Sequence, residues 1–194
     1  MPRVTADPTV NLDRVEQMTA DAAGSGARLV LLPEAALTGL INNDDPAHDL
    51  PLGQAIPGPA TDRLGAVARL HSLWVGFGLF ERDGDCLYDS AVLIAPDGSV
   101  ALKYRRNQPQ WHGIAAGPAI YRQGTSIEIA STPFGSVGFL ICGDLFDDAL
   151  VARFRALRPD LLLFPFARCF PDGSADQARW DAKEMPEYAR QVVS

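Results

Sequence analysis

The stretch GFLICGD, residues 138–144, joins an apolar run to a polar turn and places a cysteine, Cys142, at the junction. A short continuous apolar run is typical of a strand that is buried on both faces. The polar residues after it begin a predicted helix over residues 144–157. We therefore expect Cys142 to lie at the carboxyl edge of a sheet, next to the first turn of a helix.

The segments on either side alternate between helical and strand patterns. Before the cysteine we expect helices over 11–26 and from about 61, with strands over 28–33, 74–81, 87–95, 100–104, 126–129 and 137–142. After the predicted helix we expect a strand over 160–164 and a helical tail from about residue 176, interrupted at Pro186. This order predicts a single α/β domain, residues 1–194, in which helices flank the sheets.

Composition excludes several classes of function. The chain has 194 residues, a formal net charge of −7 and a pI near 4.9, which argue against binding nucleic acid or an anionic membrane. No apolar run reaches the length of a membrane span, and the first residues lack the apolar core of a secretory signal. The three cysteines, Cys86, Cys142 and Cys169, form no CxxC motif. A reduced, cytoplasmic location is the expectation.

The position of Cys142 suggests chemistry. The positive end of a helix favours a thiolate, so we expect a lowered pKa for the Cys142 thiol and a nucleophilic role. The backbone N–H of Gly143 would lie near the oxyanion of a tetrahedral intermediate. On position alone, a buried structural cysteine is an equal alternative.

Two further residues lie at predicted strand ends. Glu34 follows the buried strand and precedes Ala35, and apolar surroundings would make it a better proton acceptor. Lys103 lies near the end of the predicted strand 100–104, where a fixed cation could stabilise developing negative charge. Taken one at a time, a satisfied loop carboxylate and a solvated surface lysine are the commoner interpretations.

Together, three segments resemble motifs of the nitrilase superfamily of carbon–nitrogen hydrolases, in the same order. They are LLPEAALTG at 31–39, LKYRR at 102–106 and GFLICGDLF at 138–146. Shorter similarities occur in PGPATDRL at 57–64 and RPDLLLFP at 158–165. Any one of these motifs would be weak evidence, whereas three in order are more specific.

The resemblance implies a fold, a partner and a mechanism. The fold would be an α-β-β-α sandwich that associates into a homo-oligomer, at least a dimer. Glu34 would be the general base, Lys103 the oxyanion stabiliser and Cys142 the nucleophile of a thioester mechanism. The substrate would be a small amide, N-carbamoyl amine or nitrile, with an amide favoured. No metal or organic cofactor is expected.

The sequence also departs from the family pattern. Many members carry a second glutamate in a loop where this chain reads Ala116-Gly117-Pro118-Ala119, and an aromatic residue follows the cysteine where this chain has Gly143. Compared with the family, the opening strand and the last strands are expected to be missing, which would make the domain partial.

Other interpretations stay open at this stage. His112 could serve as the base for Cys142, but Trp111 and His112 are preferred as residues that line a substrate pocket, together with Phe166 and Ala167. A non-catalytic subunit of the same fold and an acyltransferase that uses the same cysteine are the alternative functions. The remaining histidines show no metal-ligand spacing, and Cys86 and Cys169 are expected to be structural.

Overall fold

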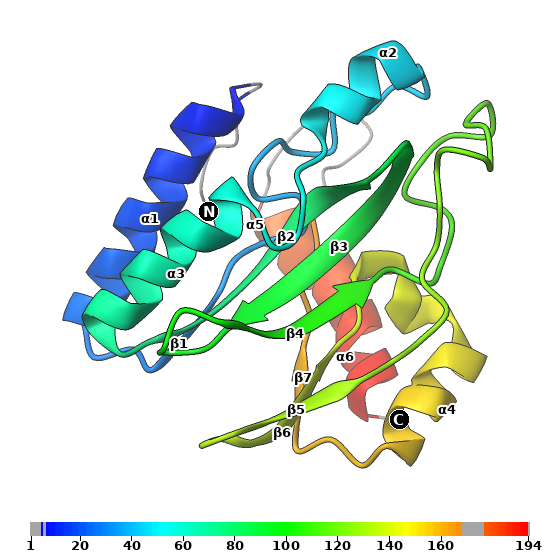
Figure 1. Ribbon diagram of the computed structural model, residues 1–194. Coiled ribbons are helices and arrows are strands. Elements are labelled where there is room, and N and C mark those ends of the chain that lie inside the picture. Colours follow the sequence, from blue (N-terminus) through cyan, green and yellow to red (C-terminus); the bar gives the residue numbers. More distant parts are fainter. Residues whose placement is uncertain (1–4, 6, 168–176, 194) are drawn as a thin grey trace.

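The structure is a computed structural model that describes residue 5 and residues 7–167 and 177–193. Two β-sheets pack against each other, with helices on both outer faces (Figure 1). This is the α-β-β-α sandwich implied by the resemblance. Within the described residues, no helix is long and apolar enough to cross a bilayer.

The first sheet has the strand order β1-β2-β3-β4. Its strands are β1 (Leu29–Leu31), β2 (Trp74–Asp83), β3 (Cys86–Ile94) and β4 (Val100–Arg105). Strand β1 runs parallel to β2, and the other neighbours are antiparallel. A tight turn joins β3 to β4: Gly98 adopts a positive φ of 82°, and the Asp97 carboxylate accepts the Ser99 N–H at 2.8 Å.

The second sheet is smaller and has the strand order β5-β6-β7. Its strands are β5 (Ile129–Thr132), β6 (Gly135–Phe139) and β7 (Leu161–Leu163), with β6 antiparallel to β5 and parallel to β7. Val137 and Phe139 face the first sheet and belong to one buried cluster with Leu93 and Tyr104. The contact between the two sheets therefore forms the central core of the molecule.

Helices cover the two outer faces (Figure 1). Helix α1 (Pro8–Gly24) and helix α3 (Pro59–His71) pack on the first sheet, and the Asp7 side chain caps α1 by accepting the Thr9 and Val10 N–H groups. The short elements α2 (Pro46–Asp49) and a 3₁₀ turn (Leu50–Leu52) lie between them in sequence. On the second sheet pack α4 (Asp148–Ala156) and α6 (Met185–Val193), the latter preceded by α5 (Gln177–Arg179) and a π-helical turn (Trp180–Glu184).

Three predicted elements differ from the structure. The helix expected over 144–157 is a 3₁₀ turn (Cys142–Phe146) followed by α4, because Asp147 leaves the helical conformation and caps α4 by accepting the Leu150 N–H. The strand expected over 126–129 begins only at Ile129. Pro186 does not interrupt the helical tail, which runs on from the π-helical turn into α6. Just before the proline the Met185 N–H donates to the Trp180 carbonyl in the wider π-helical pattern, which replaces the regular α-helical ladder there.

Gly78 in the middle of β2 lets the segment after β1 approach the sheet. A Cβ atom at Gly78 would lie 2.6 Å from Glu34 Cα and 2.9 Å from Ala35 N, both of them backbone atoms. The Ala36 N–H also donates to the Gly78 carbonyl at 2.8 Å, which holds the segment in place. The glycine is therefore required for the close approach that positions Glu34.

We expect Gly78→Ala to lower the free energy of unfolding by about 1–3 kcal/mol, because the added methyl group forces two backbone segments apart. Urea unfolding of both proteins would measure the loss. Gly117→Ala is the matched control, since a Cβ there meets no atom within 4 Å. Equal stabilities of the two variants would contradict the close approach.

Candidate active site

Cys142 lies three residues past the end of β6, in a strained backbone conformation. Its φ of 43° is in the left-handed region that residues with a side chain seldom adopt. The Cys142 N–H donates to the Pro165 carbonyl at 3.1 Å, which ties the turn to the segment after β7. The cysteine borders a cavity of about 490 Å³. The lining residues are Arg106, Gln108, Gln110, Cys142, Gly143 and Phe146.

Glu34 enters the same site from the segment after β1 and is 1% exposed. Its two carboxylate oxygens have different partners. Oε1 accepts a hydrogen bond from Arg106 Nη1 at 2.9 Å, and Oε2 accepts one from the Ala167 N–H at 2.8 Å. A buried carboxylate held at both oxygens is oriented before any substrate arrives.

Arg106 is the cation of this site. It directly follows β4, is 4% exposed, and its Nη1 also lies 3.4 Å from Asp89 Oδ2. Burial opposes the charge on the guanidinium, but the Asp89 and Glu34 carboxylates outweigh that cost and raise the pKa of Arg106. A Cβ atom at Gly143 would clash with Arg106 Nη2, so the glycine after the cysteine makes room for the guanidinium.

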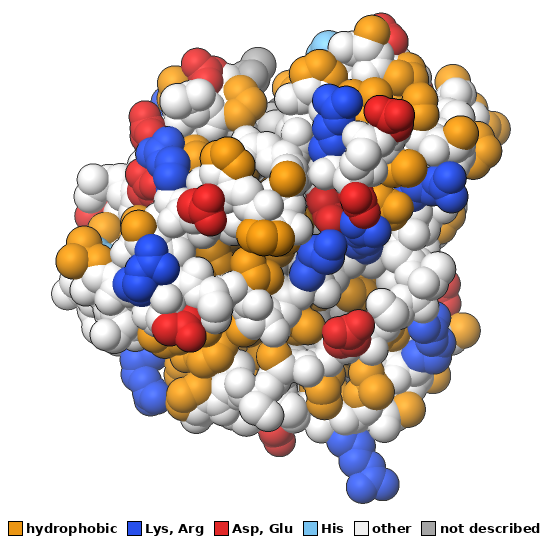
Figure 2. All heavy atoms as spheres, viewed as in Figure 1, with side chains coloured by type: hydrophobic (Ala, Val, Ile, Leu, Met, Phe, Trp, Pro, Cys, Tyr) orange, Lys and Arg blue, Asp and Glu red, His pale blue; other side chains and the backbone are white. Residues whose placement is uncertain are grey.

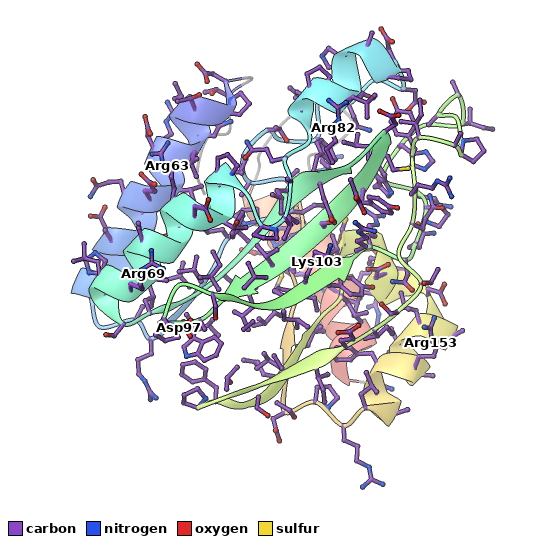
Figure 3. All side chains as sticks on the ribbon, viewed as in Figure 1. Arg63, Arg69, Arg82, Asp97, Lys103 and Arg153 are labelled. Atoms are coloured by element: carbon purple, nitrogen blue, oxygen red, sulfur yellow. The ribbon has the colours of Figure 1, made fainter. Side chains whose placement is uncertain are left out.

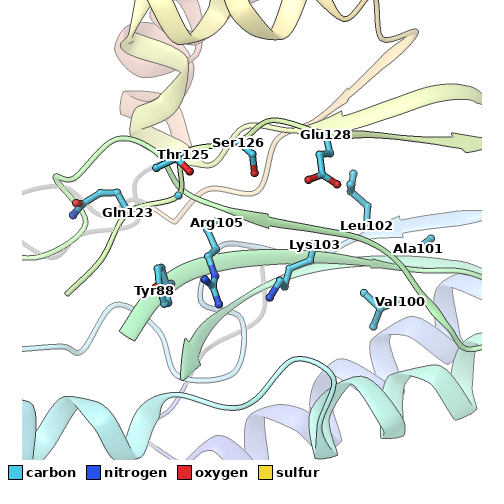
Figure 4. A pocket seen from close by; sticks show the side chains of 11 residues that line it. Tyr88, Val100, Ala101, Leu102, Lys103, Arg105, Gln123, Thr125, Ser126 and Glu128 are labelled. Carbon is cyan, nitrogen blue, oxygen red and sulfur yellow. The ribbon is translucent and has the colours of Figure 1, made fainter. Parts of the chain in front are cut away.

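Lys103, predicted as the oxyanion stabiliser, lies elsewhere. Its Nζ donates to Glu81 Oε1 at 2.9 Å, and Arg105 binds the same carboxylate. Figure 3 labels Lys103 on β4, and Figure 2, in the same view, shows basic and acidic side chains side by side near the centre of this face. Figure 4 shows Lys103 and Arg105 among the residues that line a groove. The groove has a volume of about 560 Å³, and Cys142 is not one of its lining residues.

The alternation of side chains along β4 explains this placement. Leu102 and Tyr104 point into the core between the sheets, whereas Lys103 is exposed on the other face and pairs in register with Val92, a residue of the α1/α3 core. Arg106 is two residues after Tyr104 and therefore points to the same face as Tyr104. The structure therefore brings Glu34 and Cys142 together but does not bring Lys103 to them, and its position does not support the predicted role.

Asp144 connects the two sheets at the site. Its Oδ1 accepts the backbone N–H groups of Asn107 and Gln108 at 3.1 and 2.8 Å. Its Oδ2 accepts the Tyr104 hydroxyl at 2.7 Å and the Ile141 N–H at 3.0 Å. Burial raises the pKa of Asp144, against the hydrogen bonds that lower it. This carboxylate fixes the loop after Arg106 against the turn that carries the cysteine.

The thiol of Cys142 does not have the lowered pKa expected from the sequence. Burial and, after it, the Glu34 carboxylate raise the pKa of the thiol to about 12, although Arg106 opposes the rise. The expected helix dipole is weak here, because the cysteine begins a 3₁₀ turn of five residues and α4 starts only at Asp148. At neutral pH the group is therefore a thiol that needs a base, rather than a free thiolate.

The predicted pocket residues have different surroundings. Trp111 is buried with Phe80 and Tyr121, and His112 interacts with the Gln123 side chain at 3.1 Å and the Gly113 carbonyl at 3.0 Å. Neither borders the cavity at Cys142. Among the described residues, no contact of His112 brings it to Cys142 as a base.

Of the residues after β7, Ala167 reaches the site through its N–H bond to Glu34. Phe166 instead stacks on Trp180, with ring centroids 5.4 Å apart. Cys86 is a free cysteine whose Sγ lies 3.6 Å from the Ala119 carbonyl, whereas Cys169 lies outside the described residues.

Asp89, Arg106 and Asp144 were not singled out from the sequence. The one sequence signal for Arg106 is the alternation of side chains along β4. Arg106 is two residues after Tyr104, so both side chains are expected on the inward face of the sheet. Asp89 stands within an apolar strand, YDSAVLI, where a lone carboxylate is unexpected. Among the described residues, no group of acidic, histidine or cysteine side chains could hold a metal ion.

The carbon–nitrogen hydrolase family model matches residues 1–183. The chain belongs to this family. Among curated relatives, Nitrilase 3 of Arabidopsis thaliana is 29% identical over 168 residues, covering 76% of this chain and 47% of that protein. A bifunctional nitrilase/nitrile hydratase of Oryza sativa subsp. japonica is 31% identical over 156 residues, covering 70% of this chain and 42% of that protein. The chain thus spans about half the length of these relatives.

Solved structures of the nitrilase superfamily share the fold. An amidase from Nesterenkonia sp. superposes with a TM-score of 0.76 at 24% identity, covering 96% of this chain and 67% of that one. A mutant of the Nesterenkonia sp. AN1 amidase, which carries acrylamide added to its active-site cysteine, superposes with a TM-score of 0.75 at 23% identity, covering 96% of this chain and 70% of that one. At this identity the likeness concerns the fold alone.

In a chain that carries Cys86→Ser and Cys169→Ser, we expect alkylation of Cys142 by iodoacetamide to keep accelerating at pH values above the ordinary thiol pKa of 9.0. Glu34→Gln should lower the pKa of Cys142, because Glu34 is the carboxylate that raises it most. Rates read by peptide mass over a pH series would measure both values. An inflection of the alkylation rate of the parent chain at a pH below 9.0 would contradict the burial of the thiol.

Proposed function

We propose that this chain carries the active site of a thiol-dependent hydrolase of a small amide, with Cys142 as nucleophile, Glu34 as general base and Arg106 as oxyanion stabiliser. The observation that carries the proposal is the meeting of Glu34 and Arg106 at the strained turn of Cys142. Backbone strain and interacting charged groups cluster at functional sites.

The protonation states support general-base activation. The Cys142 thiol holds its proton at rest, and the Glu34 carboxylate next to it can accept that proton as sulfur attacks the amide carbon. The C–N bond then breaks, and the amine leaves with the proton from Glu34. Water activated by Glu34 hydrolyses the thioester, which returns the acid and the free thiol.

The oxyanion would be held by the Gly143 N–H and by Arg106. The guanidinium lies over Gly143 and lines the cavity at Cys142. Its Nη1 is engaged by carboxylates, whereas Nη2 lies at the glycine, next to the nucleophile. A fixed cation in a buried site stabilises charge that develops in the transition state. We therefore assign to Arg106 the role that the sequence suggested for Lys103.

An amide is the proposed substrate class, in keeping with the amidases among the structural relatives and with the chemistry of a thioester mechanism. N-carbamoyl amines and nitriles would use the same residues. Transfer of the acyl group to an amine in place of water also needs no other residue. The homo-oligomer implied by the family resemblance stays a prediction.

Charge removal at two positions tests the assignment of the cation. We expect Arg106→Gln to lower kcat for short aliphatic amides by about 10²–10³-fold, the loss typical of one oxyanion donor, and Lys103→Gln to leave kcat nearly unchanged. Ammonia release measures turnover. Arg106→Lys serves as a charge-retaining control, because removal of one partner of a buried ion pair also costs about 3–5 kcal/mol of stability.

Assays of the parent chain and its variants with several substrates decide between the candidate functions. Intact-mass analysis of acid-quenched mixtures should show an acyl adduct that disappears in Cys142→Ala. An adduct that resolves only when an amine acceptor is added would indicate an acyltransferase. Absence of both adduct and ammonia across amides, N-carbamoyl amines and nitriles would refute the proposal and favour a non-catalytic subunit. A loss in Lys103→Gln as large as that in Arg106→Gln would overturn the role of Arg106.

A further inference from the structure

Asp89 is a buried carboxyl group that the proposed mechanism does not use. It lies in β3, on the face that points between the sheets, and is 1% exposed. Its Oδ2 is 3.4 Å from Arg106 Nη1, the same nitrogen that donates to Glu34 at 2.9 Å. Two carboxyl groups with fully buried side chains thus share one guanidinium nitrogen.

The charges of this cluster do not balance if both carboxyl groups are ionised. Arg106 supplies one positive charge, and Glu34 alone neutralises it. A second carboxylate would leave a net negative charge in a buried site, which is costly. Asp144, the other buried acid near Asp89, would add to the repulsion rather than relieve it. A proton on one carboxyl group removes the excess charge.

The hydrogen bonds indicate which group holds the proton. Glu34 accepts a bond at each oxygen, as a carboxylate does. Among the described residues, Asp89 Oδ1 is buried without a hydrogen-bond donor, and such an unpartnered oxygen is unfavourable. A proton converts Asp89 into a donor, and Glu34 is the carboxylate with which it interacts.

We propose that Asp89 is a neutral carboxylic acid in the folded protein and donates a hydrogen bond to Glu34, as a positioning residue of the site. Burial and the neighbouring Glu34 both raise the pKa of Asp89 well above its ordinary value. The neutral acid has two effects. It adds a hydrogen bond that orients the general base, and it spares the Cys142 thiol a further negative charge that would hinder its ionisation.

The inference concerns the site of the proposed function, but its test reads protonation and needs no turnover. Failure of the one proposal is therefore distinguishable from failure of the other. The folded chain holds a proton on Asp89 that the unfolded chain releases above the ordinary aspartate pKa of 3.8. Stability must then fall as pH rises above that value, until the folded pKa is reached, because the folded state binds more protons.

Asp89→Asn reproduces the shape of the neutral acid and removes this linkage. The quantity to compare is the equilibrium constant for unfolding of the parent chain, divided by that of Asp89→Asn. Between pH 5 and 7 we expect this ratio to rise about tenfold per pH unit, which is the value for one linked proton. Urea unfolding at each pH measures the ratio. Asp85→Asn is the matched control, because the Asp85 side chain is 98% exposed and the variant should keep the pH dependence of the parent. Parallel pH dependence of the parent and Asp89→Asn would overturn the proposal.

Infrared spectroscopy gives a second measurement, whose first readout needs only the parent chain. The parent chain at pH 7 should show the C=O stretch of a protonated carboxyl group. The band should vanish in Asp89→Asn, and also in Glu34→Gln, where Asp89 becomes the sole carboxylate partner of Arg106 and ionises. A parent chain without the band at pH 7 would refute the neutral acid, as would a band unchanged in both variants.

Discussion

The buried guanidinium of Arg106 is the interaction on which the site depends. It lies at the end of the first sheet, contacts the Glu34 and Asp89 carboxyl groups and extends over the glycine that follows Cys142. The two sheets, Glu34 and the turn of Cys142 thus meet at one cation. A buried charge persists only when its partners are fixed, so the surrounding backbone has little freedom.

Glycines and a carboxylate provide this fixed geometry. Gly78 admits the backbone of Glu34 to the sheet, and Gly143 leaves space for the guanidinium. Asp144 accepts hydrogen bonds from the segment after β4 and from the turn after β6, and so links the backbone next to Arg106 to the turn that carries Cys142. The positive φ of Cys142 is a local strain that these contacts hold in place.

Electrostatics keeps Cys142 protonated at neutral pH. Burial and the Glu34 carboxylate favour the thiol, and Arg106 opposes them only in part. Such a group is inert until its proton is taken, which suits a mechanism in which one carboxylate serves both the attack and the hydrolysis of the thioester. The second face of β4 is chemically different: Lys103 and Arg105 share Glu81 there and border a separate groove (Figure 4).

The sequence by itself determined the family and the order of elements, and the family resemblance named Glu34 and Cys142 for one candidate site. Apolar runs are local signals, so β2, β3 and β4 were predicted within a few residues. Only the tertiary structure decided which cation reaches them. Lys103 and Arg106 lie three residues apart on β4 and its extension, and therefore on opposite faces of the sheet. Which of the two faces meets Cys142 is decided only when the second sheet packs on the first. The pKa of the cysteine and the protonation of Asp89 likewise depend on burial between two sheets, which arises only when distant segments pack together.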